Sequence, residues 1–265
     1  MSLTRSSLLF ACAALFTLGF WSCETDSPID SSPAQRTTLE YYLNQRSGMG
    51  LSRQLIACAA GGRAFAENDN PEKPISIFYL PVEGATDIRY WETDSIEVDP
   101  DSLLLYRERS LERLPVFGGF LGRFTRSNPG KELWCRITYL TADSVHVCNA
   151  IRLKMPDEPT LVAHSAVDIR ETRPGYPKFT WEDPSSENVI YFQVISDAAG
   201  DLLTGTYTFD QNWQFYDLNN VVININDIYT NPQLSPLAKY QFTLMGVSVD
   251  NWVHTFASKP FVIEP

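Results

Sequence analysis

The chain has 265 residues, of which 44% are hydrophobic and 20% are charged, and its formal net charge is −11. This composition is typical of globular domains rather than of a disordered chain, and the length leaves room for two domains and an export segment. The acidic charge, without any cluster of Lys and Arg, argues against nucleic-acid binding and against electrostatic docking onto anionic lipid.

The N-terminus has the features of an export signal. Arg5 precedes an apolar run of about 15 residues, which is short for a membrane-spanning helix of about 20 residues. The run leads into Ser22-Cys23, which resembles the lipobox of bacterial lipoproteins, where a small residue precedes an acylated cysteine. The resemblance implies a signal peptide at residues 1–22 and a lipid on Cys23. An ordinary secretory signal with an incidental cysteine is the alternative.

Residues 23–50 are expected to form a tether that contains a short helix. The tether begins acidic and rich in Ser and Pro, without apolar periodicity, which predicts an extended segment. Thr37 lies three residues before Glu40, the spacing of a capping box, and apolar residues then recur at helical spacing. The next stretch, residues 51–65, fits either a second short helix or the first strand of a domain.

From residue 74 onward the apolar pattern has a period of two, which predicts short strands with almost no helix. We therefore expect an all-β fold of two tandem β-sandwiches, at residues 51–156 and 157–265. The expected strands lie at residues 75–81, 85–94, 102–109, 132–140, 144–153, 178–183, 188–197, 205–210, 220–226, 239–248 and 259–265.

The second half carries the marks of a known family. Trp181 ends an early strand, and Leu234, Pro236 and Tyr240 have the spacing L-x-P-x-x-x-Y before a later strand. This resembles a fibronectin type III domain, in which the tyrosine packs under a strand crossover and its hydroxyl reaches a backbone group upstream. The resemblance implies two sheets packed face to face, and it makes both halves fibronectin type III-like if the first half is a diverged copy.

Two observations support a diverged copy and define the expected cores. Residues 81–94 and 184–197 have equal lengths, and each segment follows an aromatic strand end.

Alternation in the first half places Ile77 and its apolar neighbours at 75 and 79 on one face, and in the second half it makes Ile190, Phe192 and Val194 the inward face. Because that set looked complete, we expect residues 158–265 to fold alone.

Three cysteines remain once the signal peptide, which contains Cys12, and the acylated Cys23 are set aside: Cys58, Cys135 and Cys148. Cys135 and Cys148 flank a predicted hairpin, so a disulfide between them is one candidate pairing. If Val145 and Val147 point inward, however, Cys148 points outward, and the disulfide then needs a different register from the one that alternation predicts. The pairing stays open at this point.

Motifs that carry chemistry are missing from the sequence. His146, His164 and His254 are far apart and have no zinc-ligand spacing, and there is no nucleophile elbow or phosphate-binding loop. The glycine-rich stretch 116–124 is expected to be a bent strand. Five acids within residues 92–101 could hold Ca²⁺, although a solvated acidic loop is the favoured interpretation. We expect no enzyme, no metal and no cofactor.

One segment offers a candidate contact site. Residues 247–257 are expected to contain the turn between the last two strands, and they place Asp250 and Asn251 beside Trp252 and His254. An aromatic face next to hydrogen-bonding groups suits stacking on a sugar or anchoring in a partner protein, and Trp213 is a candidate contributor. The alternative is that Trp252 plugs the open end of its own sandwich.

These inferences predict a membrane-anchored extracytoplasmic lipoprotein at the outer membrane or cell surface, with a periplasm-facing position also open. Its expected role is that of a binding or assembly module for a protein or glycan partner, attached to the membrane by its lipid. A structural spacer and, less favoured, a hydrolase with a loop-built carboxylate site are the alternatives, because the sandwich fold accommodates all three.

Overall fold

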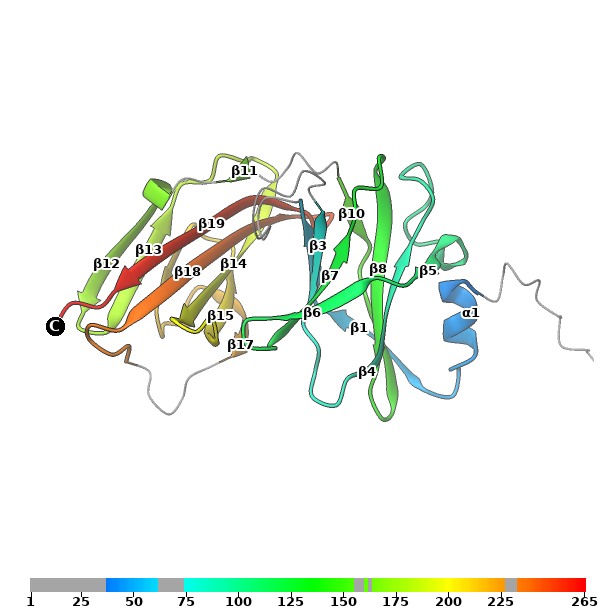
Figure 1. The fold of residues 1–265 in the computed structure, drawn as a ribbon, viewed down its shortest axis with the longest axis horizontal. Helices are drawn as coiled ribbons and strands as arrows, with labels where there is room; N and C mark the ends of the chain where they lie inside the picture. Colours follow the sequence, from blue (N-terminus) through cyan, green and yellow to red (C-terminus); the bar gives the residue numbers. More distant parts are fainter. Residues whose placement is uncertain (1–36, 62–73, 155–159, 162–163, 227–232) are drawn as a thin grey trace, which may run out of the picture.

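The structure is a computed structural model that describes residues 37–61, 74–154, 160–161, 164–226 and 233–265. Regular structure in these ranges is almost entirely β, as the sequence predicts (Figure 1). No helix in the described ranges is long and apolar enough to cross a membrane. The predicted signal peptide and Cys23 lie outside the described residues.

The first half consists of a short helix and two sheets. Sheet 1 has the strand order β1-β9-β8-β4-β5, with β10 also pairing with β8, and sheet 2 has the order β2-β3-β7-β6. The elements are α1 (Leu39–Asn44), β1 (Gly50–Leu55), β2 (Ala57–Ala60), β3 (Ile75–Tyr79), β4 (Thr86–Glu92), β5 (Arg107–Arg109), β6 (Glu112–Val116), β7 (Leu121–Arg126), β8 (Leu133–Leu140), β9 (Ser144–Cys148) and β10 (Ile151–Leu153), with a 3-10 turn at Leu103–Leu105.

The second half adds two more sheets. Sheet 3 has the order β11-β19-β18-β14-β15-β17, and sheet 4 has the order β12-β13-β16. The elements are β11 (Thr160–Leu161), a 3-10 turn at His164–Ala166, β12 (Val167–Arg173), β13 (Tyr176–Trp181), β14 (Asn188–Asp197), β15 (Leu202–Thr208), β16 (Asn212–Gln214), β17 (Val221–Asn226), β18 (Lys239–Ser248) and β19 (Val253–Val262). The predicted boundary near residue 156 falls between β10 and β11, and its position stays a prediction.

The four sheets stack as layers, with apolar side chains between each neighbouring pair. One cluster fills the space between sheets 1 and 2, and another lies between sheets 3 and 4. A third cluster joins the two halves, because it combines Phe78 and Leu121 of sheet 2 with Phe192, Val194 and Met245 of sheet 3. Helix α1 covers the outer face of sheet 1 at one end of the stack, and the C-terminus lies at the opposite end (Figure 1).

Burial on both faces explains where alternation succeeds and where it fails. In β3 the predicted face, centred on Ile77, does line the core of the first sandwich. In β14 the predicted inward face is wrong, because Phe192 and Val194 point outward into the layer shared with the first half. Tyr191 and Ile195 supply the true inward face. The two faces of β14 are both covered, so alternation alone does not identify the inner one.

The features that resemble a fibronectin type III domain are confirmed in the second half. The hydroxyl of Tyr240 accepts a hydrogen bond from the backbone N–H of Ser235 at 2.8 Å, which is the expected tyrosine corner. Trp181 is buried in the core and packs edge-on against Tyr191, with ring centroids 5.5 Å apart. The second core therefore forms around the residues that carried the resemblance.

Three local predictions need adjustment. The helix cap is Thr38 rather than Thr37, since the Thr38 side chain accepts from the N–H of Tyr41 at 3.1 Å. The ambiguous stretch 51–65 contributes strands β1 and β2. The glycine-rich stretch is the β6–β7 hairpin and not one bent strand, because Gly118 and Gly119 adopt φ angles of 66° and 91° in its turn.

Cys58, Cys135 and Cys148 are free thiols, so the candidate disulfide between Cys135 and Cys148 does not form in this structure. Cys148 is buried in the first core together with Cys135, which corrects the outward orientation expected from alternation. Val145 and Val147 instead face helix α1, whose cover makes the outer face of sheet 1 apolar. Cys135 of β8 pairs with Ile151 of β10. The Cys148 sulfur accepts a hydrogen bond from the backbone N–H of residue 137 at 3.0 Å, so the two thiols are offset along β8.

Candidate functional site at the junction of the two sandwiches

The predicted contact turn is buried between the two halves. The Trp252 side chain has 0% exposure, and it belongs to the core of the first sandwich although it follows β18 of the second. Ala59 of β2 forms a parallel bridge with Trp252, and its N–H donates to the carbonyl of Asn251 at 3.0 Å. The expectation of an exposed aromatic face is therefore wrong, and Trp252 closes the neighbouring sandwich instead of its own.

The turn owes its shape to polar residues. The N–H of Ser248 donates to the Trp252 carbonyl at 3.0 Å, and the N–H of Asn251 returns to the Ser248 carbonyl at 3.0 Å. Asn251 adopts a φ of 60°, in the left-handed region that asparagine tolerates better than most residues. The Ser248 hydroxyl also donates to a carboxylate oxygen of Asp250. This closed turn presents the indole to the first half.

The first half holds this turn on a second side as well. The Asn251 side-chain amide donates to the carbonyl of Ala150 at 3.0 Å. The N–H of Arg152, on β10, donates to the carbonyl of Asp250 at 2.9 Å. Since β2 and β10 both bond to the turn through their backbones, its position relative to the first sandwich is specified by direction-dependent contacts as well as by apolar burial.

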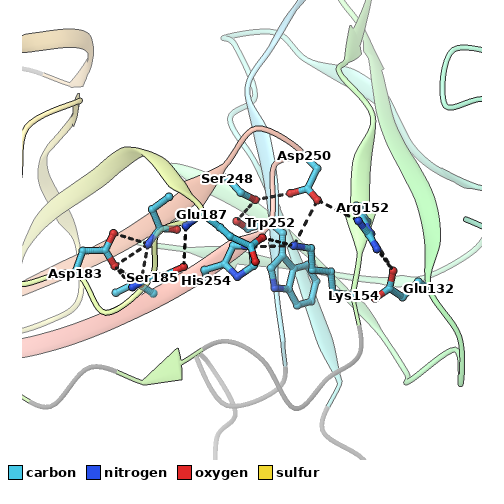
Figure 2. A network of polar contacts seen from close by, with 12 residues as sticks. Glu132, Arg152, Lys154, Asp183, Ser185, Glu187, Ser248, Asp250, Trp252 and His254 are labelled. Carbon is cyan, nitrogen blue, oxygen red and sulfur yellow. Dashed lines mark hydrogen bonds and ion pairs between the residues drawn. The ribbon is translucent and has the colours of Figure 1, made fainter.

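Charged side chains surround these backbone contacts (Figure 2). The carboxylate of Asp250 lies 3.5 Å from the Lys154 ammonium and 4.0 Å from the Arg152 guanidinium. Arg152 also donates to Glu132 at 2.9 Å, and Lys154 lies 3.2 Å from Glu187 of the second half. Two cations from the end of the first sandwich thus bridge acids from both halves.

His254 completes this network. Its Nε2 atom lies 2.9 Å from the Lys154 ammonium and 3.1 Å from a Glu187 oxygen. The same Nε2 atom accepts a hydrogen bond from Lys154 when it lacks a proton, and it donates one to Glu187 when it carries a proton. The two contacts therefore require different protonation states of Nε2. The hydrogen bond from Lys154, together with the nearby charge of His254, lowers the pKa of Glu187.

Next to the junction, Asp183, which lies just after β13, links strands β14 and β19 of the second half. Its carboxylate accepts from the Tyr191 hydroxyl at 2.6 Å, from the Asn188 amide at 2.9 Å and from the Thr255 hydroxyl at 2.8 Å. The backbone N–H of Ser185 adds a fourth donor at 3.0 Å. Burial by itself would raise the pKa of Asp183, but these donors outweigh it, so the pKa lies below its ordinary value.

Trp213 does not join the predicted site. It lies on β16, is buried in the core of the second sandwich and stacks on Phe179 with ring centroids 5.6 Å apart. The structure thus brings Asp250, Asn251, Trp252 and His254 together and leaves Trp213 elsewhere. The partners Lys154 and Glu187 were missed because they are distant in sequence from the turn, and no local pattern connects them to it.

Arginines pair with acids at both ends of the acid-rich stretch 92–101. The Glu92 side chain is buried and accepts from Arg126 at 2.9 Å and from Arg109 at 3.1 Å. Asp101 pairs with the buried Arg136 at 2.8 Å. The favoured interpretation of a solvated loop is wrong for Glu92, because its carboxylate is buried and paired with two arginines. Within the described ranges, no three His, Cys, Asp or Glu side chains form a metal-binding group.

The chemistry of the junction is suited to joining the two sandwiches. Its carboxylates are engaged by cations and hydroxyls, and its aromatic ring is inside a core. The buried indole, the backbone bonds to two strands and the ionic network all restrict movement of one sandwich against the other. The two halves are therefore joined by apolar, backbone and ionic contacts.

Comparisons with known proteins do not identify a family. No protein-family model and no curated protein sequence matches the chain. Among solved structures, a two-domain fibronectin type III segment of chicken tenascin is 12% identical, covering 72% of this chain and 93% of that chain, with a TM-score of 0.30. A structure of neurohormone perception by the receptor tyrosine kinase Torso is 10% identical, covering 85% and 84%, with a TM-score of 0.23.

A third similar structure is a β-glucuronidase from Ruminococcus gnavus, which is 12% identical over 77% of this chain and 39% of that chain, with a TM-score of 0.24. At such identities and scores, none of these likenesses bears on function. The chain is an all-β protein with two tandem fibronectin type III-like sandwiches, as its strand order and tyrosine corner indicate.

Proposed function

We propose that the protein is a lipid-anchored extracytoplasmic protein that works as a rigid binding or assembly module. The observation that carries the proposal is the apolar layer shared by sheets 2 and 3, which is locked at its rim by the inserted Trp252. Two sandwiches joined in this way hold their outer surfaces in a fixed geometry. Fixed geometry lowers the entropy lost when a partner is bound across both halves.

The junction itself is not the contact surface for that partner. Its aromatic ring and most of its polar groups are used to join the halves, so a protein or glycan has to bind elsewhere on the stack. A spacer without a ligand remains the second candidate, because the same rigidity also suits a stalk. The buried Glu92 and the hub Asp183 give no support to a hydrolase, because hydrogen-bond donors already occupy both carboxylates.

The anchor is tested by acylation. If Cys23 carries the lipid, the wild-type protein should incorporate labelled palmitate and partition into a detergent phase, whereas Cys23→Ser should do neither. Cys12→Ser is the matched control, because it removes another cysteine from the same apolar run and should leave labelling unchanged. Labelling that survives Cys23→Ser would contradict the proposed anchor.

The binding role is tested on the lipidated protein in its own membrane. Cross-linking followed by purification should recover the same partner in stoichiometric amount from independent preparations. A spacer predicts that no partner is recovered beyond the background seen with the lipid-free Cys23→Ser protein. That outcome would refute the binding role and favour the spacer.

A further inference from the structure

Strand β17 is an unprotected edge of the largest sheet in the second half. It is the last strand of sheet 3 and pairs with β15, and no strand of the described structure lies on its other side. Its sequence, VVININ, contains no charge, no proline and no glycine. An edge strand with free backbone N–H and C=O groups is a ready template for an additional strand.

The other edges in the described structure are protected or very short. Strand β10 carries Arg152, and β11 and β16 contain only two and three residues. Strands β5, β6 and β12 carry charged side chains, and β6 also contains Pro115. Strand β1 carries Arg53, and the edge of β2 is covered by its bridge to Trp252. Natural proteins protect edges with charges, proline and covering segments, so the exception at β17 indicates an edge that is kept open for pairing.

Exposed apolar side chains gather around the same edge. Val222 is 44% exposed on β17, and Phe209, just after the β15 residue that pairs with the start of β17, is 65% exposed. Tyr216 and Leu218 are exposed in the loop that leads into the strand, where the N–H of Val221 donates to the Leu218 carbonyl at 3.1 Å. Large apolar side chains clustered at one edge mark an interaction surface.

Charge determines what kind of partner fits. Residues 179–238 contain eight Asp and Glu and no Lys, Arg or His. Asp210 lies just after β15 and Asp217 lies just before β17, and no cation among the described residues pairs with either. A second copy of the chain would bring the same acids to the edge and be repelled. A segment with lysine or arginine beside its apolar residues would be attracted.

We propose that β17 is the docking edge for an extended segment of a partner protein, which adds to sheet 3 as a further strand and carries apolar side chains flanked by lysine or arginine. This rests on the proposed binding role and names its surface and the chemistry of its partner. Backbone hydrogen bonds provide the pairing, the apolar side chains around Val222 provide contact area, and the acids steer the approach.

The probe is a synthetic peptide of about ten residues in which valine alternates with lysine, a length that matches an ordinary strand. Binding to the full-length lipidated protein in nonionic detergent is followed by fluorescence anisotropy. The peptide should bind and lose affinity as salt rises, because screening acts over about 8 Å at physiological ionic strength. Versions with glutamate in place of lysine, or with prolines in place of alternate valines, should bind at least tenfold more weakly.

The matched variants are two valines of the same sheet. Val222→Lys places a charge on the proposed edge and should weaken peptide binding at least tenfold, whereas Val262→Lys, at a site 50% exposed on β19, should not. Hydrogen exchange should show new protection at residues 221–226 when the lysine peptide binds. Equal binding by Val222→Lys, or no protection at β17, would overturn the proposal.

Failure of this inference is distinguishable from failure of the binding role. If the wild type cross-links to a membrane partner and Val222→Lys captures it equally well, the binding role stands and β17 is not its surface. If sedimentation shows a dimer that Val222→Lys dissolves, the edge pairs with a second copy and the proposed basic partner is wrong.

Discussion

Replacing Trp252 by alanine should remove a buried side chain that the second half inserts into the core of the first sandwich. The side chain has 0% exposure, and a buried tryptophan removes about 150–250 Å² from water, which corresponds to about 4–6 kcal/mol at about 25 cal/mol per Å². Its indole N–H has no hydrogen-bond partner among the described residues, and an unmade bond of this kind costs about 1–3 kcal/mol. We expect Trp252→Ala to lower the free energy of unfolding by about 3–5 kcal/mol.

Urea unfolding of the full chain, followed by far-UV circular dichroism, measures this loss. Val249→Ala is the matched control, since Val249 lies in the same turn but is 82% exposed, and it should change stability by less than about 0.5 kcal/mol. Trp252→Phe keeps an aromatic ring and removes the unpartnered N–H, so it should cost clearly less than the alanine variant.

Hydrogen exchange separates this account from a tryptophan that plugs its own sandwich. Because the indole lies in the first core, Trp252→Ala should raise exchange in β2 and β3, which belong to the other half of the chain. The reasoning is refuted if the variant stays within about 0.5 kcal/mol of the wild type, a difference typical of exposed positions. It is also refuted if faster exchange is confined to the second sandwich.

Two further predictions follow from the same structure. Residues 158–265 expressed alone should self-associate or be molten and should bind a hydrophobic dye, because the outer face of sheet 3 loses its apolar cover. This is contrary to the expectation from the sequence that the segment folds alone. A soluble monomer that unfolds cooperatively would show that this face tolerates water. The pKa of Asp183 is lowered on folding, so its contribution to stability is present above about pH 3.9 and is lost as pH falls through the folded value. Unfolding free energies from about pH 6 to about pH 2 should therefore fall more steeply for the wild type than for Asp183→Asn, and parallel curves would contradict this role.

Local patterns in the sequence determined the strands and the signature of the second sandwich. Period-two alternation located most strands, and the spacing from Leu234 to Tyr240 predicted a corner whose hydroxyl bond is present in the structure. These features are readable because each depends on residues close together in the chain. Alternation also grouped Ile77 with its neighbours on one face of β3, and that face lines the first core.

Tertiary structure alone decided what covers each face. Alternation shows which residues share a face of a strand, but not what packs on that face, so it could not show that Phe192 and Val194 meet the other sandwich or that α1 covers Val147. The contact between Ala59 and Trp252 joins residues far apart in the sequence, and no periodic pattern encodes such a pairing. The site was therefore predicted at the right turn with the wrong role, because whether that turn faces water or another sheet depends on how the two halves dock.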